Sequence, residues 1–237
     1  MRPINRGSIP LTTAGQPVVF KKYKRALRHL IDRMGSYCSY CESRLPSSLA
    51  VEHMQPKSLN PALETTWDNF LLGCVNCNST KGAKEINLDD YFFPDTANTF
   101  MAFLYDDDII VKPNHILSAQ NQSKAKNTIK LVGLDVVPPK RGTIKYEEAT
   151  DRRFEHRKNA WDTALDTLND YSISNHKPTI LKYLKIIVKE QGHWSIWMTV
   201  FQNYPEVKQA LIQETIGTAS NCFDHNFKAI PRNGIEI

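Results

Sequence analysis

The 237-residue sequence predicts an α+β protein in which a small strand–strand–helix unit is followed by a mainly helical C-terminal region. Two Cys-x-x-Cys pairs, at residues 38–41 and 74–77, enclose two short apolar runs that are separated by a polar loop. After Pro113, apolar residues recur at three- and four-residue spacing, which is typical of amphipathic helices. We therefore divide the chain into a mixed region, residues 1–115, and a helical region, residues 116–237.

The composition indicates a folded protein without a membrane segment. Hydrophobic residues make up 41% of the chain and charged residues 23%, which is ordinary for a soluble domain. No apolar run is long enough to span a bilayer, and the opening M-R-P-I-N-R-G-S-I-P lacks the apolar segment of a signal peptide. We expect a cytoplasmic protein. Four of the five cysteines lie in close pairs, which favours metal binding in a reducing compartment over a disulfide framework.

The first 34 residues concentrate positive charge. They hold eight Lys and Arg residues and one acid, a net charge of +7, whereas the whole chain carries +5. We expect residues 17–34 to form an amphipathic helix that ends at Gly35, with basic residues outside its apolar stripe. These basic residues are Lys21, Lys24, Arg25 and Arg28. Such a segment suits a polyanionic partner such as nucleic acid, and a solvated helix face is the alternative.

The stretch between the cysteine pairs carries the side chains of most chemical interest. The expected elements are a strand at Ala50–Met54, a loop at 55–68, a strand near 69–73 and a helix after Cys77. The first strand carries Glu52 and His53, and the helix carries Asn78 and Lys81 on one face. The end of the strand should meet the start of the helix, which brings Glu52 to Asn78. Because strand neighbours point to opposite faces, the strand must end or twist at His53 for both its residues to share a site.

The rest of the chain predicts a short hairpin and then helices. Residues 100–113 are expected to form two strands joined by an acidic turn at Asp106–Asp108, and a metal cluster there is the alternative. Helices are expected near 118–132, 144–170, 178–191, 194–203 and 205–216. His156 lies in the charged run R-R-F-E-H-R-K of a long helix and is expected to be a solvated position.

The four paired cysteines predict a closed zinc site. Thiolates two residues apart grip one Zn²⁺ from a single turn, and a second pair completes a tetrahedron. The ligands are Cys38, Cys41, Cys74 and Cys77. The 32 residues between the two pairs exceed what a compact zinc ribbon needs, so the metal is expected to pin the ends of a catalytic insert. Four free buried thiols are the alternative.

The order of residues inside this frame resembles a known family. His53, then Asn69 after 15 intervening residues and Asn78 after eight more, resembles the HNH endonuclease motif of the ββα-metal type over residues 38–82. Asn78 stands where many members of that family carry histidine. The resemblance implies that the side-chain amide of Asn69 bridges the loop and holds the histidine in place. It also implies that His53, Asn69 and Asn78 are the catalytic residues.

Phosphodiester hydrolysis gives these residues definite roles. A neutral His53, with a reference pKa of about 6.5, suits a general base near pH 7, and a satisfied core histidine is the alternative. Glu52 and Asn78 offer oxygen ligands, which favour Mg²⁺ or Mn²⁺ as the catalytic ion. Lys81 and Lys57 are candidate phosphate contacts, and solvated lysines are the alternative reading.

A wider likeness covers the remaining features. The opening M-R-P-I-N-R, the basic helix, the His-Asn-Asn form of the motif and the helical second half resemble the PtuB family. That family is the HNH component of Septu-type and retron-linked bacterial anti-phage systems. The resemblance implies an ATPase partner similar to PtuA and, in retron-linked systems, a reverse transcriptase with its DNA product. The helical region is then a candidate docking region for a partner.

Three functions remain open from sequence. The first is a metal-dependent endonuclease, with DNA favoured as substrate, that acts in phage defence. The second is an RNase that cleaves tRNA with the same site. The third is a non-catalytic four-cysteine zinc module that binds nucleic acid or a protein.

Overall fold

The computed structural model describes residues 1–232 and 237 of the chain. Its α-helices are α1 Leu27–Met34, α2 Val75–Lys81, α3 Thr99–Ala102, α4 Ala119–Val132, α5 Ile144–Glu147, α6 Arg153–Ile173, α7 Lys177–Gln191, α8 Trp194–Val200 and α9 Pro205–Glu214. Its strands are β1 Ala50–His53, β2 Phe70–Gly73, β3 Phe103–Leu104 and β4 Lys112–Pro113. Short 3₁₀ turns are η1 Tyr23–Ala26, η2 Pro61–Leu63, η3 Trp67–Asn69, η4 Leu88–Asp90 and η5 Ser220–Cys222. Among the described residues, no helix has both the length and the apolar composition that crossing a bilayer requires.

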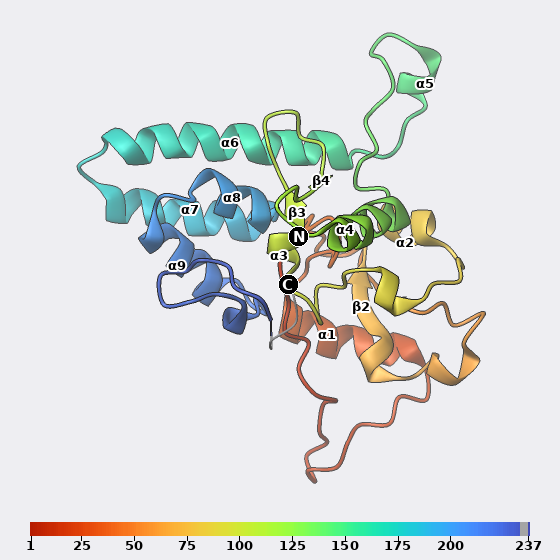
Figure 1. The fold of residues 1–237 in the computed structure, drawn as a ribbon. Helices are drawn as coiled ribbons and strands as arrows, with labels where there is room; N and C mark the ends of the chain where they lie inside the picture. The colour runs from red at the N-terminus through yellow and green to blue at the C-terminus, as the bar shows by residue number, and fades with distance from the viewer. Residues whose placement is uncertain (233–236) are drawn as a thin grey trace.

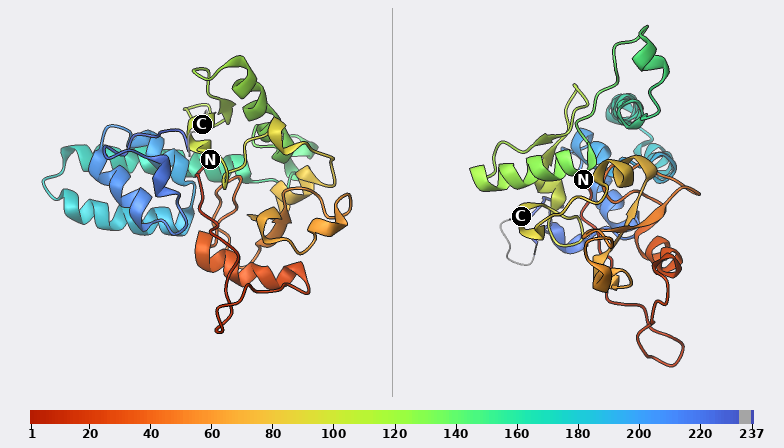
Figure 2. Two further views of the ribbon diagram at one scale, coloured as in Figure 1. Left: turned by 60° about the horizontal axis from the view of Figure 1, so that its bottom comes forward. Right: turned by 90° about the vertical axis from the view of Figure 1, so that its right-hand side faces the viewer.

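The elements form two groups, as the sequence predicts for an α+β chain. Helices α6 to α9 pack together on one side, and α1, α2, α4 and the β1–β2 hairpin lie on the other (Figure 1). The left view of Figure 2 shows the same separation, and its right view shows the excursion that carries α5 projecting away from the other elements. The chain termini lie between the two groups (Figure 1). The prediction of a mixed first part and a mainly helical second part is confirmed.

The β1–β2 hairpin and α2 form the expected strand–loop–strand–helix unit. The two strands are antiparallel, with Ala50 opposite Gly73 and His53 opposite Phe70. Helix α2 begins directly after β2, where the side chain of Cys74 caps it by accepting a hydrogen bond from the backbone N–H of Cys77. The cap places the second cysteine pair at the start of the helix.

Buried apolar side chains form two cores. The first is built from residues before 135, together with Ile237, and it includes the apolar face of α4. The second lies between Ala160 and Phe223 in the helical region. Tyr105 packs against both. Helix α4, which the sequence analysis placed in the helical region, therefore packs with the first core.

A buried carboxylate joins the two groups. Glu42 lies in the turn after the first cysteine pair, and its carboxylate accepts hydrogen bonds from the backbone N–H and the hydroxyl of Ser195 on α8, at 2.8 and 2.6 Å. The backbone carbonyl of Glu42 also accepts from the N–H of His193, at 3.0 Å. The N-terminal ammonium of Met1 lies 3.5 Å from the same carboxylate. A buried carboxylate with partners from both groups stabilises one relative placement of the elements that supply them.

Two expected helices differ from the structure. The helix expected over 17–34 is regular only from Tyr23, as η1 followed by α1. Phe20 lies outside the helix because its ring is buried and stacks on the ring of Trp67, with 5.9 Å between the ring centroids. The helix expected over 144–170 is split into α5 and α6. The carboxylate of Asp151 accepts from the backbone N–H of Arg153 at 3.1 Å and so favours a helix start at that point.

Candidate functional site

The four cysteines of the two pairs meet in one buried cluster. All their Sγ atoms lie within 4.8 Å of one another, and those of Cys41 and Cys74 are 3.7 Å apart. Four sulfurs bound tetrahedrally to zinc at about 2.3 Å lie about 3.8 Å from one another. The cluster therefore has the geometry of a structural zinc site with no open coordination position. It is the only such grouping of His, Cys, Asp or Glu found within residues 1–232 and 237.

Local hydrogen bonds support three of the four sulfurs. The backbone N–H of Cys74 donates to Cys38 Sγ at 3.4 Å, and that of Cys77 donates to Cys74 Sγ at 3.3 Å. The hydroxyl of Ser43 lies 3.4 Å from Cys41 Sγ, where it donates once the sulfur is a thiolate. Such donors offset the negative charge that four thiolates gather in a buried site.

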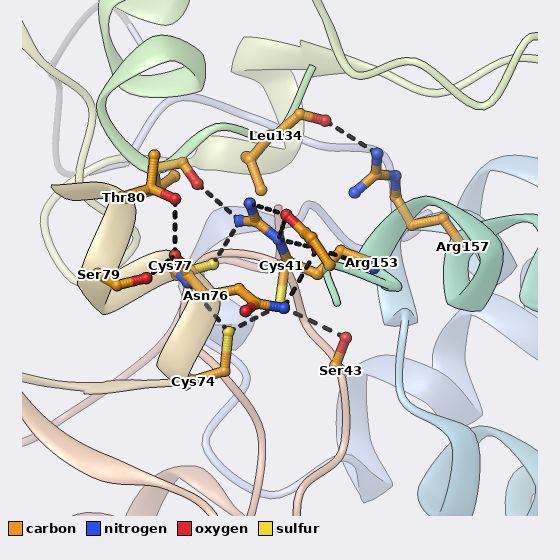
Figure 3. Close-up of polar contacts among 12 residues, drawn as sticks. Cys41, Ser43, Cys74, Asn76, Cys77, Ser79, Thr80, Leu134, Arg153 and Arg157 are labelled. Carbon is orange, nitrogen blue, oxygen red and sulfur yellow. Dashed lines mark hydrogen bonds and ion pairs between the residues drawn. The ribbon is translucent and has the colours of Figure 1, made fainter. Parts of the chain in front are cut away.

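The fourth sulfur receives its donor from the helical region. Arg153, the first residue of α6, donates from Nη1 to Cys77 Sγ at 3.1 Å and to the carbonyl oxygen of Val132 at 2.6 Å (Figure 3). Asp151 holds the guanidinium from the other side, at 2.9 Å from Nε and 2.7 Å from Nη2. Arg157, one turn on, donates to Leu134 O at 2.9 Å (Figure 3). His156 is exposed, as the sequence predicts, whereas both arginines of the same charged run are buried.

His53 is the last residue of β1, and its ring is held on three sides. Tyr23 and Phe70 contact the ring edge to face, with centroids 4.9 and 5.2 Å away. The carbonyl oxygen of Glu64 lies 2.9 Å from Nε2. A carbonyl only accepts, so Nε2 carries the proton in the neutral ring and the lone pair is on Nδ1. Burial lowers the pKa of His53 below its usual 6.5, against the raising effect of the Glu64 carbonyl.

The side chain of Asn69 forms hydrogen bonds with the backbone of the loop that joins β1 to β2. Its Oδ1 accepts from the backbone N–H of Gln55 at 2.8 Å, and its Nδ2 donates to the carbonyl of the same residue at 2.9 Å. A longer contact of 3.4 Å joins Nδ2 to the carbonyl of Leu63, the residue before Glu64. Asn69 thus contacts the loop at both its start and the point that holds His53.

Glu52 and Lys81 form a buried ion pair. Only 3% of Glu52 and 1% of Lys81 are exposed, and Lys81 Nζ lies 3.0 Å from Glu52 Oε1. The directional bond of that ammonium goes instead to the carbonyl oxygen of His53, at 2.7 Å, and Oε1 has no well-aligned donor among the described residues. Burial raises the pKa of Glu52, and the ammonium of Lys81 opposes that rise. Lys81 is therefore inside the site and not on the surface where a solvated lysine would lie.

A cleft brings the candidate residues together. Its volume is about 210 Å³. Glu52, His53, Asn78, Lys81, Lys57 and Tyr23 are among the residues that line it. Asn78 is half-buried. A Cβ on Gly73 would lie 3.1 Å from the Cβ of Glu52 and 3.7 Å from that of Asn78, so these two side chains flank the same glycine. Strand β1 ends at His53, which allows Glu52 and His53 to share the cleft.

Basic residues lie near the mouth of this cleft. Lys57 is exposed, pairs with Glu64 at 3.3 Å and lies over the ring of Tyr23, 4.3 Å from its centroid. Tyr23 opens η1, and the basic residues flanking it, Lys21, Lys24, Arg25 and Arg28, are all exposed. Arg28 is paired with Asp32 at 2.8 Å. Positive charge thus continues from the cleft onto the N-terminal segment.

The fold and the site define a ββα unit framed by a four-cysteine cluster, with a histidine, a carboxylate and an amide in its cleft. Residues 38–84 match the family model of the HNH endonucleases. This segment is an HNH endonuclease domain, a hydrolase of phosphodiester bonds, and its family implies a nucleic-acid substrate and a divalent metal. A search of curated proteins found no match to the chain.

Proposed function

We propose that the chain is a metal-dependent endonuclease whose catalytic residues are His53, Asn69 and Asn78. The observation that carries this proposal is the free Nδ1 of His53 in a cleft that also presents Glu52 and Asn78. A buried core histidine would bury both nitrogens or pair them, whereas only Nε2 of His53 is engaged among the described residues. The match to the HNH model over the same segment supports this role.

The cleft residues have distinct parts in the hydrolysis. His53 accepts a proton at Nδ1 from the attacking water, and its lowered pKa keeps it neutral and ready to do so near pH 7. The Glu64 carbonyl fixes the tautomer and the direction of the ring. Asn69 holds that carbonyl in place through the loop, so it acts on the reaction by positioning the base.

Glu52 and Asn78 are the proposed ligands of the catalytic ion. A carboxylate and an amide oxygen are the hard donors that Mg²⁺ or Mn²⁺ takes, and such ions keep several waters in sites of this kind. The oxygen Oε1 of Glu52, which is buried without a well-aligned donor among the described residues, fits this assignment. When bound, the ion would act as a Lewis acid on the phosphate and stabilise the departing 3′ oxygen.

The substrate is proposed to be DNA. Lys57 at the cleft and Lys21, Lys24, Arg25 and Arg28 beyond it provide a basic path for a phosphate backbone. Lys81 is proposed to act inside the site, next to the metal ligand, and not along this path. The zinc bound by the four cysteines holds the frame and takes no part in the chemistry.

We further propose a biological setting in bacterial phage defence. The support is the sequence resemblance to the PtuB family, including the opening M-R-P-I-N-R and the helical second half. In this proposal residues 1–115 form the nuclease region, and residues 116–237 dock an ATPase partner resembling PtuA. A reverse transcriptase and its DNA product join them in a retron-linked form.

A cleavage assay with two variants tests the enzymatic proposal. Purified, zinc-loaded protein is incubated with labelled DNA and labelled RNA in Mg²⁺, in Mn²⁺ and in EDTA, with and without the candidate ATPase. We expect cleavage of DNA that needs the divalent ion and is lost in His53→Ala, with zinc retained. Loss of zinc and of fold is expected for Cys74→Ser. A wild-type protein that cuts neither polymer under any of these conditions would remove the proposal. Cleavage of RNA alone would favour the RNase reading.

A further inference from the structure

Lys81 is an unusual residue for its position in the cleft. It is the last residue of α2, where a lysine ordinarily extends into solvent, yet only 1% of it is exposed. Its ammonium lies 3.0 Å from Glu52 Oε1 and donates to the carbonyl oxygen of His53 at 2.7 Å. A positive charge buried to this degree persists only where the surrounding groups compensate it, and Glu52 provides the compensating charge.

The same carboxylate is the proposed ligand of the catalytic ion. The ammonium already neutralises Glu52, so a divalent cation arriving at that carboxylate meets a like charge at short range in a poorly screened site. A second polar group, the fully buried hydroxyl of Tyr40, also lies close to this carboxylate and lowers the pKa of Glu52. The pocket around Glu52 therefore already contains one cation beside the carboxylate, and it buries both charges.

We propose that Lys81 is a built-in cation that competes with the divalent metal for Glu52, so that metal binding displaces its ammonium from the carboxylate. The inference rests on the proposed function, because it takes Glu52 as a metal ligand. The cleft of about 210 Å³ that borders both residues gives the displaced side chain a place to go. In this reading the nuclease domain has a metal-free resting form that Lys81 stabilises.

Metal affinity measured without any substrate tests the competition. Lys81→Met removes the competing charge and keeps an unbranched apolar side chain. Lys84→Met is the matched control, since Lys84 lies three residues on, is exposed and donates to Thr80 O at 2.9 Å. Both variants change the net charge equally. Mn²⁺ binding is followed by electron paramagnetic resonance, and Glu52→Gln identifies the signal that belongs to this site.

We expect Lys81→Met to bind Mn²⁺ at least tenfold more tightly than the wild type, and Lys84→Met to stay within twofold. Unchanged or weaker binding by a folded Lys81→Met protein would overturn the inference. A wild-type protein that binds no Mn²⁺ at Glu52 would overturn both the inference and the metal assignment in the proposed function. Metal-dependent cleavage with unchanged affinity in Lys81→Met would remove the inference alone.

A second measurement uses the unaltered protein and so does not depend on the variant folding. Lysine acetylation with acetic anhydride, followed by mass spectrometry, reports which ammonium groups reach solvent. We expect Lys81 to be protected without Mn²⁺ and several-fold more reactive at saturating Mn²⁺. Lys84 should react equally in both states. Protection of Lys81 that does not change on metal saturation would contradict the displacement.

Discussion

The imidazole of His53 donates from Nε2 to the carbonyl oxygen of Glu64 at 2.9 Å, which leaves Nδ1 as the basic nitrogen. The partner is a backbone group, so it neither titrates nor changes charge in the range where the histidine does. The strand supplies the base, and the loop that Asn69 closes supplies the group that orients it. The orientation of the base is therefore a property of the whole hairpin.

The first prediction concerns the pH dependence of cleavage. The active form of His53 is neutral, so the rate rises as pH passes upward through its pKa and then levels off on that side. Burial lowers this pKa below 6.5, which places the midpoint of the acid limb below pH 6.5. The check is kcat/KM for a short labelled DNA duplex between about pH 5 and about pH 8 at saturating Mg²⁺. A midpoint above 6.5 would show that His53 is not the titrating base.

The second prediction concerns the loop. Asn69→Ala removes two hydrogen bonds to the backbone of Gln55 and leaves buried polar groups unpaired, so it should lower the free energy of unfolding by about 1–3 kcal/mol. Urea unfolding measures the change. Asn60→Ala is the control, because Asn60 lies in the same loop and, among the described residues, its side chain donates one hydrogen bond, of 3.3 Å, to Pro56 O. Equal effects of the two substitutions would argue against a special role for Asn69.

The third prediction links the helical region to the zinc site. Arg153→Met removes the charged donor to Cys77 Sγ and should weaken zinc binding by roughly 10- to 100-fold, the usual cost of losing a group that supports a metal ligand. Transfer of zinc to a chromogenic chelator reports the change. Arg152→Met removes the same charge from the exposed neighbouring residue, whose side chain is 65% exposed, and should behave as wild type. If zinc leaves both variants at the wild-type rate, Arg153 does not support the site.

Local patterns made the frame of the site predictable. Cys-x-x-Cys spacing specifies a turn that presents two sulfurs, and the family model matches this same segment. The hairpin followed from short apolar runs with a polar loop between them. The turn that carries each cysteine pair and the order of the two strands are features that residues close in sequence determine, whereas helix α2 starts at Val75, before the expected position after Cys77.

Burial made the remaining features unpredictable. The burial of Lys81 and Arg153 could not be predicted, because the groups that bury them come from segments distant in the chain. Phe20 was expected in the helix but lies outside it, because its ring stacks on Trp67, a residue of the loop between the two strands. No sequence pattern distinguishes these buried charged residues from exposed ones, so only the structure shows that they support the two sites.

The proposed activity depends most directly on His53 as the base of a metal-dependent hydrolysis. Single-turnover cleavage of labelled DNA in Mg²⁺ compares the wild type with His53→Ala, and His156→Ala serves as an exposed-histidine control. We predict a rate for His53→Ala lower by roughly 10²- to 10⁴-fold, the usual contribution of a general base, in a protein that stays folded and keeps its zinc. A His53→Ala protein that is folded, zinc-loaded and cleaves at the wild-type rate would contradict the assignment of this cleft as the catalytic site.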